Sequence, residues 1–306
     1  MEPNATAPLN RDIEMFLMTS QFLELDFDFG LQQLNSYLQD LEFLKMGGRY
    51  DELGIAERRR DSMPRLLVPG DSSMYNLVDK WDMLDGVTPP GSIALLKLSG
   101  VMRSQSGISS PGVDRLASDL RMAYNNQNVT GIVLETLSGG GESLAGTLLK
   151  SALSERNKPV VGFGHLVASA AYRALTGTDE IIMSSAQSEV GSIGTMISLD
   201  MKELGKFRER FAEFYGTDAP NKNGELRKAV AGDFAAIQSR VDTLTREFHN
   251  EIKRDRPLQG DKSAIAETLS GAMFNAADGK RRGLVDAVGN LPFAIRRVNA
   301  LKSKYK

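Results

Sequence analysis

Between residues 92 and 183, short apolar runs alternate with stretches that have helical spacing. The apolar runs fall at 93–98, 130–135, 158–163 and 180–183, and the helical stretches at 113–124, 143–153 and from 169 onward. Strands that alternate with helices of about 10–15 residues predict right-handed βαβ units and a parallel sheet. This pattern therefore predicts an α/β fold for the middle of the chain.

The regions on either side of this alternation have different patterns. Toward the C-terminus, apolar residues step by three and four from Phe234 to Ile252, which predicts a long amphipathic helix that ends before Pro257. Toward the N-terminus, leucines recur at helical spacing from Leu31 to Leu44, and prolines and glycines punctuate the segment up to residue 91. We therefore expect a helical extension with linkers over 1–90 and a core domain over 91–306.

Composition excludes several classes of site. The chain has no cysteine and two histidines, which excludes disulfides, thiolate zinc sites and cysteine nucleophiles and argues against any resident metal. The net charge of −2 shows no basic excess for a nucleic-acid partner. No apolar run approaches the roughly 18 residues that span a bilayer, and the N-terminus has no basic start. We expect a cytoplasmic protein without a membrane span.

A glycine run, Ser138-Gly139-Gly140-Gly141, follows the second predicted strand. Glycines leave backbone N–H groups free to face a cleft, where they can stabilise an oxyanion or hold a phosphate at a helix N-terminus. The sequence lacks the spacing of either common phosphate-binding glycine motif. Taken alone, such a run is most often a flexible turn between a strand and a helix.

Ser169 lies among small residues, between Ala168 and Ala170, where the third strand gives way to a helix. It is a candidate nucleophile, although a helix cap is the commoner role of a serine in this position. A nucleophilic serine needs a base, and neither His165 nor His249 is well placed in the sequence to supply one. A lysine kept neutral by burial is the alternative, because desolvation lowers the pKa of a lysine.

A third segment, Glu189 to Thr195, alternates small and apolar residues. This pattern indicates a tight bend, either beside a binding cleft or with a purely structural role. Together, the motifs Ser138-Gly139-Gly140, Ala168-Ser169-Ala170-Ala171-Tyr172, Gly191-Ser192-Ile193-Gly194 and Gly283-Leu284-Val285-Asp286 stand in the order found in one family. Over residues 92–290 the chain resembles the signal peptide peptidase A family of serine peptidases, which has the Clp protease/crotonase fold. The resemblance implies a spiral core of repeated ββα units.

The resemblance also implies roles for individual residues. Ser169 would be the nucleophile, and Lys222, which lies 53 residues further on, would be the general base. Lys228, Lys206 and Lys97 are the alternatives for the base. The backbone N–H groups of Gly140 and Ala170 would form the oxyanion hole. The substrate would bind along Gly139, Gly141, Ser192, Ile193 and Gly194.

Three features depart from the family pattern. Ser138 replaces the usual proline of the family's S-P-G-G motif, Ala170-Ala171 replaces two glycines, and the sequence around Lys222 is less basic than usual. The sequence around Lys222 and the polar N-terminal extension resemble those of the phage and prophage members of this family, which are head maturation proteases. The implied partners are polypeptides, including capsid or scaffold precursors, and further copies of the chain in a ring. No cofactor or metal is implied.

Other functions remain open at this level. A catalytically idle capsid-assembly scaffold would explain each motif singly, with Ser169 as a helix cap. A bacterial peptidase that degrades signal peptides would share the whole mechanism. A crotonase-like acyl-CoA enzyme would share the glycine-rich oxyanion loop, but it would rely on acidic residues and a pocket for coenzyme A.

Overall fold

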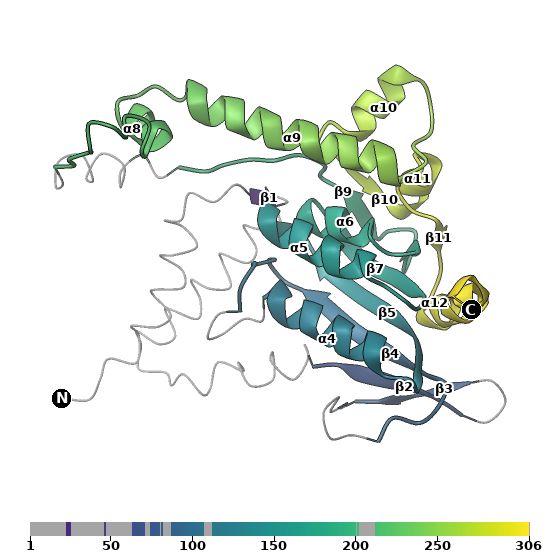
Figure 1. Ribbon diagram of the computed structural model, residues 1–306. Helices are drawn as coiled ribbons and strands as arrows, with labels where there is room; N and C mark the ends of the chain where they lie inside the picture. The colour runs from purple at the N-terminus through teal and green to yellow at the C-terminus, as the bar shows by residue number, and fades with distance from the viewer. Residues whose placement is uncertain are drawn as a thin grey trace, which may run out of the picture.

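The computed structural model describes residues 23–25, 46, 63–70, 74–79, 81, 87–106, 112–199, 201 and 212–305. Its main sheet has the order β10-β9-β7-β5-β4-β2-β3, and β8 and β11 pair beside β7 (Figure 1). A second, small sheet consists of β1 and β6. The expected mixed α/β fold with a mostly parallel sheet is confirmed.

Parallel strands joined by helices form the centre of the molecule. The strands are β4 (Ser92–Ser99), β5 (Val129–Ser138), β7 (Val160–Ala168), β8 (Glu180–Met183) and β9 (Glu189–Gly191). The helices between them are α4 (Val113–Asn125), α5 (Ser143–Ser154) and α6 (Ala170–Leu175). Every pairing of β4 with β5, β5 with β7, and β7 with β8 or β9 is parallel. The predicted alternation of strands and helices is therefore confirmed.

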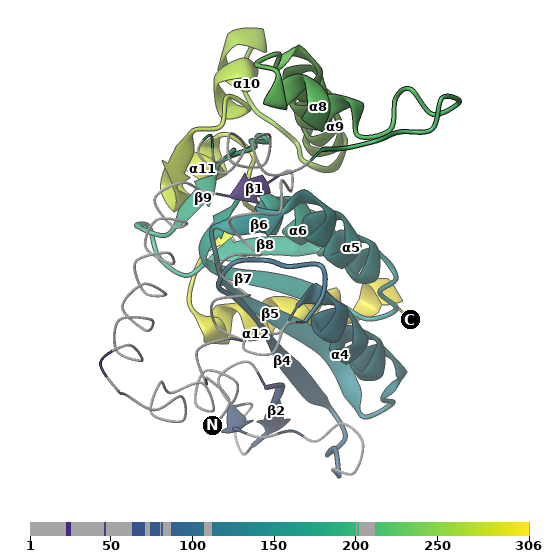
Figure 2. The same ribbon diagram turned by 90° about the vertical axis from the view of Figure 1, so that its left-hand side faces the viewer.

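Both faces of the central sheet are apolar because helices cover both. Helices α4, α5 and α6 pack on one face, and α12 (Leu291–Leu301) packs on the other (Figure 2). Val133 and Val161 point to the α12 side, where they join Ile295 in a buried cluster. Near-continuous apolar strands are the expected consequence of burial on two faces.

Two antiparallel strands extend the sheet at its N-terminal side. They are β2 (Arg65–Pro69), which pairs with β4, and β3 (Tyr75–Val78), which pairs with β2. These residues fall in the region for which a helical extension was predicted, so the sheet begins well before residue 91. The leucine-rich segment 31–44 lies outside the described residues.

The C-terminal part is mostly helical, as predicted. Its elements are α8 (Gly224–Val230), α9 (Ala235–Asp255), α10 (Lys262–Thr268), β10 (Met273–Asn275), α11 (Ala276–Arg281) and β11 (Ala287–Val288). Two ion pairs join the C-terminal half of α9 to α5. Lys150 Nζ lies 2.8 Å from Glu251 Oε2 and 2.5 Å from Asp255 Oδ2. The other end of α9 leads away from the body toward α8 (Figure 1).

Candidate functional site

Three neighbouring strands end at the same edge of the sheet, and this edge brings the predicted motifs together. Ser138 of β5 is level with Val167 of β7, and Ala168 of β7 is level with Gly191 of β9. The glycine run, Ser169 and the segment after Gly191 each follow directly from one of these strands. The carboxyl ends of parallel strands are the usual location of a site in such sheets.

Ser169 has an unfavourable backbone conformation. Its φ is 55° and its ψ is −120°, a region that residues with a side chain rarely adopt. Two backbone bonds hold it there, since its N–H donates to the Gly191 carbonyl at 2.9 Å and its own carbonyl accepts from the Arg173 N–H at 2.9 Å. Strain of this kind is concentrated at functional sites.

The Ser169 hydroxyl is buried without a partner. The residue is 1% exposed, and among the described residues its Oγ has no hydrogen bond. A buried polar atom without a partner is costly and uncommon in folded proteins. The Ser169 hydroxyl is therefore available to form a hydrogen bond with a group from outside the described residues.

The glycine run turns sharply before β6 (Gly140–Glu142) and α5. Gly140 has a φ of 99°, in the region that favours glycine. A Cβ atom at Gly141 would lie 2.1 Å from the Met102 carbonyl oxygen, so only glycine fits there. The segment β5–β6–α5 forms one of the expected ββα units.

Ser138 holds this turn in place through its hydroxyl. The Oγ donates to the Gly100 carbonyl at 2.7 Å and accepts the Gly140 N–H at 3.1 Å. The N–H expected to stabilise an oxyanion is thus already bonded to Ser138. The Ser138 hydroxyl thus connects the glycine run to the loop at Gly100.

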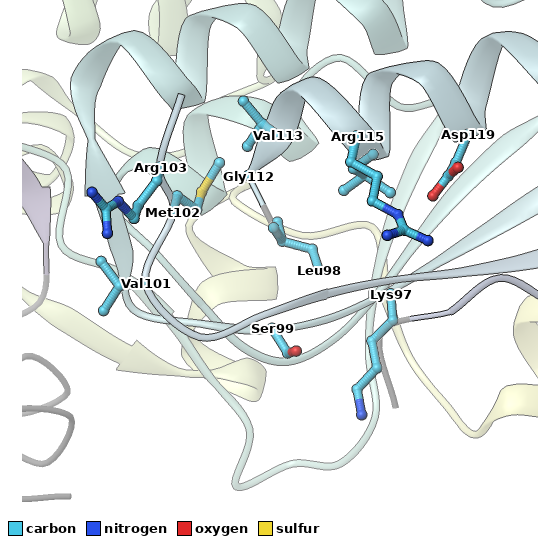
Figure 3. Close-up of a pocket in the computed structure, with 11 residues that line it drawn as sticks. Lys97, Leu98, Ser99, Val101, Met102, Arg103, Gly112, Val113, Arg115 and Asp119 are labelled. Atoms are coloured by element: carbon cyan, nitrogen blue, oxygen red, sulfur yellow. The ribbon is translucent and has the colours of Figure 1, made fainter. Parts of the chain in front are cut away.

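Strand β6 has different partners on its two edges. On one edge, the Met102 N–H donates to the Gly140 carbonyl at 2.8 Å and the Glu142 N–H donates to the Met102 carbonyl at 2.9 Å. The loop that carries Met102 runs past the start of α4, beside Val113 (Figure 3). The other edge of β6 pairs with β1 (Leu23–Leu25). Neither partner was identified from the sequence.

The segment 192–194 follows β9, on the opposite side of Ser169 from the glycine run that follows β5. Ser192 has a φ of 52°, and its N–H donates to the Ala272 carbonyl at 2.9 Å. The side chain of Ile193 is fully buried, and its carbonyl faces His249 Nε2 at 3.3 Å. Burial lowers the pKa of His249. The predicted substrate-binding residues therefore flank the serine on two sides, Gly139–Gly141 after β5 and Ser192–Gly194 after β9.

Ala170 begins α6 directly after the serine. Helix α5 approaches it closely at Gly146, where a Cβ atom would lie 2.9 Å from the Ala170 carbonyl oxygen. Arg173, one turn further on, is buried over the ring of Phe248 in α9, at 4.2 Å from the ring centroid. Helices α5 and α9 therefore both pack against the start of α6, which follows Ser169.

The structure does not bring the predicted base to the serine within this chain. Lys222 is exposed on the turn before α8, at the far end of α9 from α6 (Figure 1). Lys228 is exposed on α8 itself, and Lys206 lies outside the described residues. Lys97 of β4 points its ammonium group away from α4 (Figure 3). No described lysine is bonded to the Ser169 hydroxyl.

The histidines have other partners. His165 lies with Nδ1 2.8 Å from Ser184 Oγ and Nε2 3.4 Å from Glu135 Oε1, on a partly exposed surface. Among the described residues, no group of three or more histidine, aspartate or glutamate side chains could hold a metal ion. Within the same residues, no helix has the length and apolarity needed to cross a membrane.

Comparison with known proteins points to one class of relative, while no family model matches the chain. Protease 4 of Haemophilus influenzae is 24% identical over 229 residues, covering 72% of this chain and 36% of the relative. The chloroplast serine protease SPPA of Arabidopsis thaliana is 25% identical over 284 residues, covering 86% and 41%. The chain therefore spans less than half the length of these relatives.

Among solved structures, a membrane-bound stomatin-specific protease is similar with a TM-score of 0.45 and 13% identity, over 67% of this chain and 82% of that one. The sequence relatives, although low in identity, support the signal peptide peptidase A family for this chain.

Proposed function

We propose that the chain is a serine peptidase in which Ser169 is the nucleophile. The observation that carries this proposal is the Ser169 turn, which combines a strained backbone with a buried hydroxyl that has no partner among the described residues. A serine that merely capped α6 would accept a bond from the first turn, and no such bond is present. The two relatives described above are both proteases by name, which supports the same chemistry.

Acyl transfer would proceed as follows. A base takes the proton of Ser169 while Oγ attacks a peptide carbonyl, and the same group then returns the proton to the leaving amine. The Ala170 N–H and the Gly140 N–H face the developing oxyanion, for which Gly140 must exchange its bond to Ser138 for one to the substrate. Water then hydrolyses the acyl-enzyme.

The base is proposed to be Lys222 of a neighbouring copy of the chain. The α8–α9 arm projects from the body and carries this lysine away from its own Ser169 (Figure 1). Phe214, on the same projecting part, is 94% exposed, so its ring is accessible to another copy of the chain. In a ring of copies, such an arm would reach the next subunit and complete its site.

Two steps test this proposal. First, a fluorophosphonate probe should label the wild type on Ser169 and leave Ser169→Ala unlabelled, as shown by intact mass. Second, Ser169→Ala and Lys222→Ala should each be inactive on an unfolded protein such as casein, yet an equal mixture of the two should recover activity.

The recovery should reach roughly a quarter of the wild-type rate, because half of the subunits carry the serine and half of their neighbours carry the lysine. Lys228→Ala is the matched control, since Lys228 is also exposed on the arm. A mixture without activity would exclude a base supplied between subunits. Absence of labelling in a folded, assembled wild type would favour the idle scaffold, and turnover of an acyl-CoA thioester would favour the crotonase-like alternative.

The natural substrate is a separate question. Processing of capsid or scaffold precursors stays a prediction from the sequence resemblance, because the names of the two protease relatives do not refer to a phage. Cleavage of purified candidate precursors by wild type and not by Ser169→Ala would test it.

A further inference from the structure

Helix α9 turns two polar side chains toward the segment that follows β9. The helix passes over the end of β9 (Figure 1). Phe248 and Ile252 are fully buried on the face of α9 that packs against the body. Thr245 and His249 lie next to them on this face, because residues three and four apart in a helix are neighbours. The contact between α9 and the body is therefore partly polar.

Two hydrogen bonds join this face of α9 to residues 193–195. His249 Nε2 lies 3.3 Å from the Ile193 carbonyl oxygen, and since a carbonyl only accepts, the ring nitrogen is the donor. The Thr195 N–H donates to Thr245 Oγ1, also at 3.3 Å. Helix α9 thus supplies one donor and one acceptor to the backbone of this segment.

The two bonded backbone groups belong to alternate residues. In an extended segment, alternate residues turn their N–H and C=O groups to the same edge, and the residue between them turns its groups to the other edge. The residue between Ile193 and Thr195 is Gly194, where a Cβ atom would have no described atom within 4 Å. One edge of the segment is therefore bonded to α9, and there is open space beside Gly194 for another chain.

The same part of the molecule holds the serine turn. Phe248 lies under the guanidinium group of Arg173, which is one turn along α6 from Ser169. The Gly191 carbonyl, at the end of β9, accepts the Ser169 N–H at 2.9 Å. Helix α9 therefore contacts both the helix that follows the serine and the segment that follows β9, so it can fix their relative position.

We propose that Thr245 and His249 are positioning residues, which hold residues 193–195 so that an extended peptide pairs at Gly194 and presents a carbonyl to Ser169. The proposal rests on the serine peptidase function argued above. Binding by strand addition depends on where the backbone donors and acceptors of the receiving segment lie. Because neither side chain is bonded to Ser169, the effect of both should be confined to substrates long enough to reach Gly194.

The first experiment removes each hydrogen bond by an apolar substitution, His249→Leu or Thr245→Val. Initial rates on casein below saturation give kcat/KM, which should fall by roughly three- to tenfold in each variant, as expected for one lost hydrogen bond. The rate of fluorophosphonate labelling of Ser169 should stay at the wild-type value, because the probe reacts with the serine without pairing along the segment.

Conservative variants and a matched control complete the design. His249→Gln keeps an N–H donor at the end of the side chain, and Thr245→Ser keeps the hydroxyl. Both should cleave casein within about twofold of the wild-type rate. Thr243→Val is the control, because Thr243 is exposed on α9 and its hydroxyl donates to the Ser239 carbonyl of the same helix. It should leave both rates unchanged.

The outcomes separate the positioning role from the function on which it rests. Casein cleavage at the wild-type rate in both His249→Leu and Thr245→Val refutes the positioning role and leaves the peptidase standing. A parallel loss of casein cleavage and probe labelling shows that the two bonds only support the fold, and this also refutes the role. A wild type that neither reacts with the probe nor digests casein overturns the peptidase function and this inference together.

Discussion

Removal of the Ser169 hydroxyl should make the protein more stable. The Oγ atom is buried and has no hydrogen-bond partner among the described residues. Leaving a buried hydroxyl unsatisfied costs about 1–3 kcal/mol, whereas loss of the hydroxyl itself removes little packing. We therefore expect Ser169→Ala to raise the free energy of unfolding by about 1 kcal/mol, the lower end of that range.

The backbone at Ser169 adds a second, separable contribution. A residue other than glycine at a φ of 55° and ψ of −120° stores strain of roughly 1–3 kcal/mol, which alanine keeps and glycine relieves. Glycine also loses more chain entropy on folding, by about 0.5–1 kcal/mol. Ser169→Gly should therefore be at least as stable as Ser169→Ala.

Equilibrium unfolding in urea at one fixed protein concentration measures these differences. Ser92→Ala is the matched control, because Ser92 is equally buried but its Oγ donates to the Pro89 carbonyl at 2.6 Å. The free energy of unfolding of Ser92→Ala should fall by about 1 kcal/mol, as is typical for a lost hydrogen bond. If Ser169→Ala were instead destabilised to the same extent as the control, its hydroxyl would have a partner in solution and the reasoning would fail.

Three further changes have defined outcomes. Tyr172→Phe should cost about 1–2 kcal/mol in urea unfolding, because the buried hydroxyl donates to the Leu284 carbonyl at 2.8 Å and that acceptor would lose its partner. Burial raises the pKa of Asp119 from 3.8 to about 6, so its charged form opposes folding as the pH rises through that window. In urea unfolding, Asp119→Asn should therefore raise the free energy of unfolding by about 1 kcal/mol at pH 7, after allowance for solvent screening. The same substitution should leave it unchanged below pH 4. Gly141→Ala should abolish fluorophosphonate labelling, because its Cβ would meet the Met102 backbone at 2.1 Å.

Local patterns predicted the central elements well. The runs at 93–98 and 180–183 became β4 and β8, and the apolar steps up to Ile252 became α9, because burial of one face or both faces leaves a period in the sequence. The motif glycines and Ser169 met at one edge because parallel strands bring their carboxyl ends together.

Features that depend on pairing between distant segments leave no periodic pattern of apolar residues in the sequence. In β2, Leu66 and Leu67 are both buried although they point to opposite faces, so no alternation marked the strand. The pairing of β1 with β6 and the bridge from Met102 are backbone contacts, which depend little on side-chain identity. The position of Lys222 relative to Ser169 is likewise set by how α9 packs, and a count of residues between them cannot reveal it.

The separation of the candidate nucleophile from the candidate base has a chemical consequence. A lysine can act as a base only when its amine is neutral, and desolvation against another surface favours the neutral form. If the arm of one copy covers the site of the next, the same contact would deliver the amine and remove water from it. Among the residues that the structure describes, a monomer would then hold a buried, unpartnered serine without a base, and assembly itself would activate it. Fluorophosphonate labelling should therefore depend on protein concentration, with weak labelling at high dilution and full labelling of the assembled form.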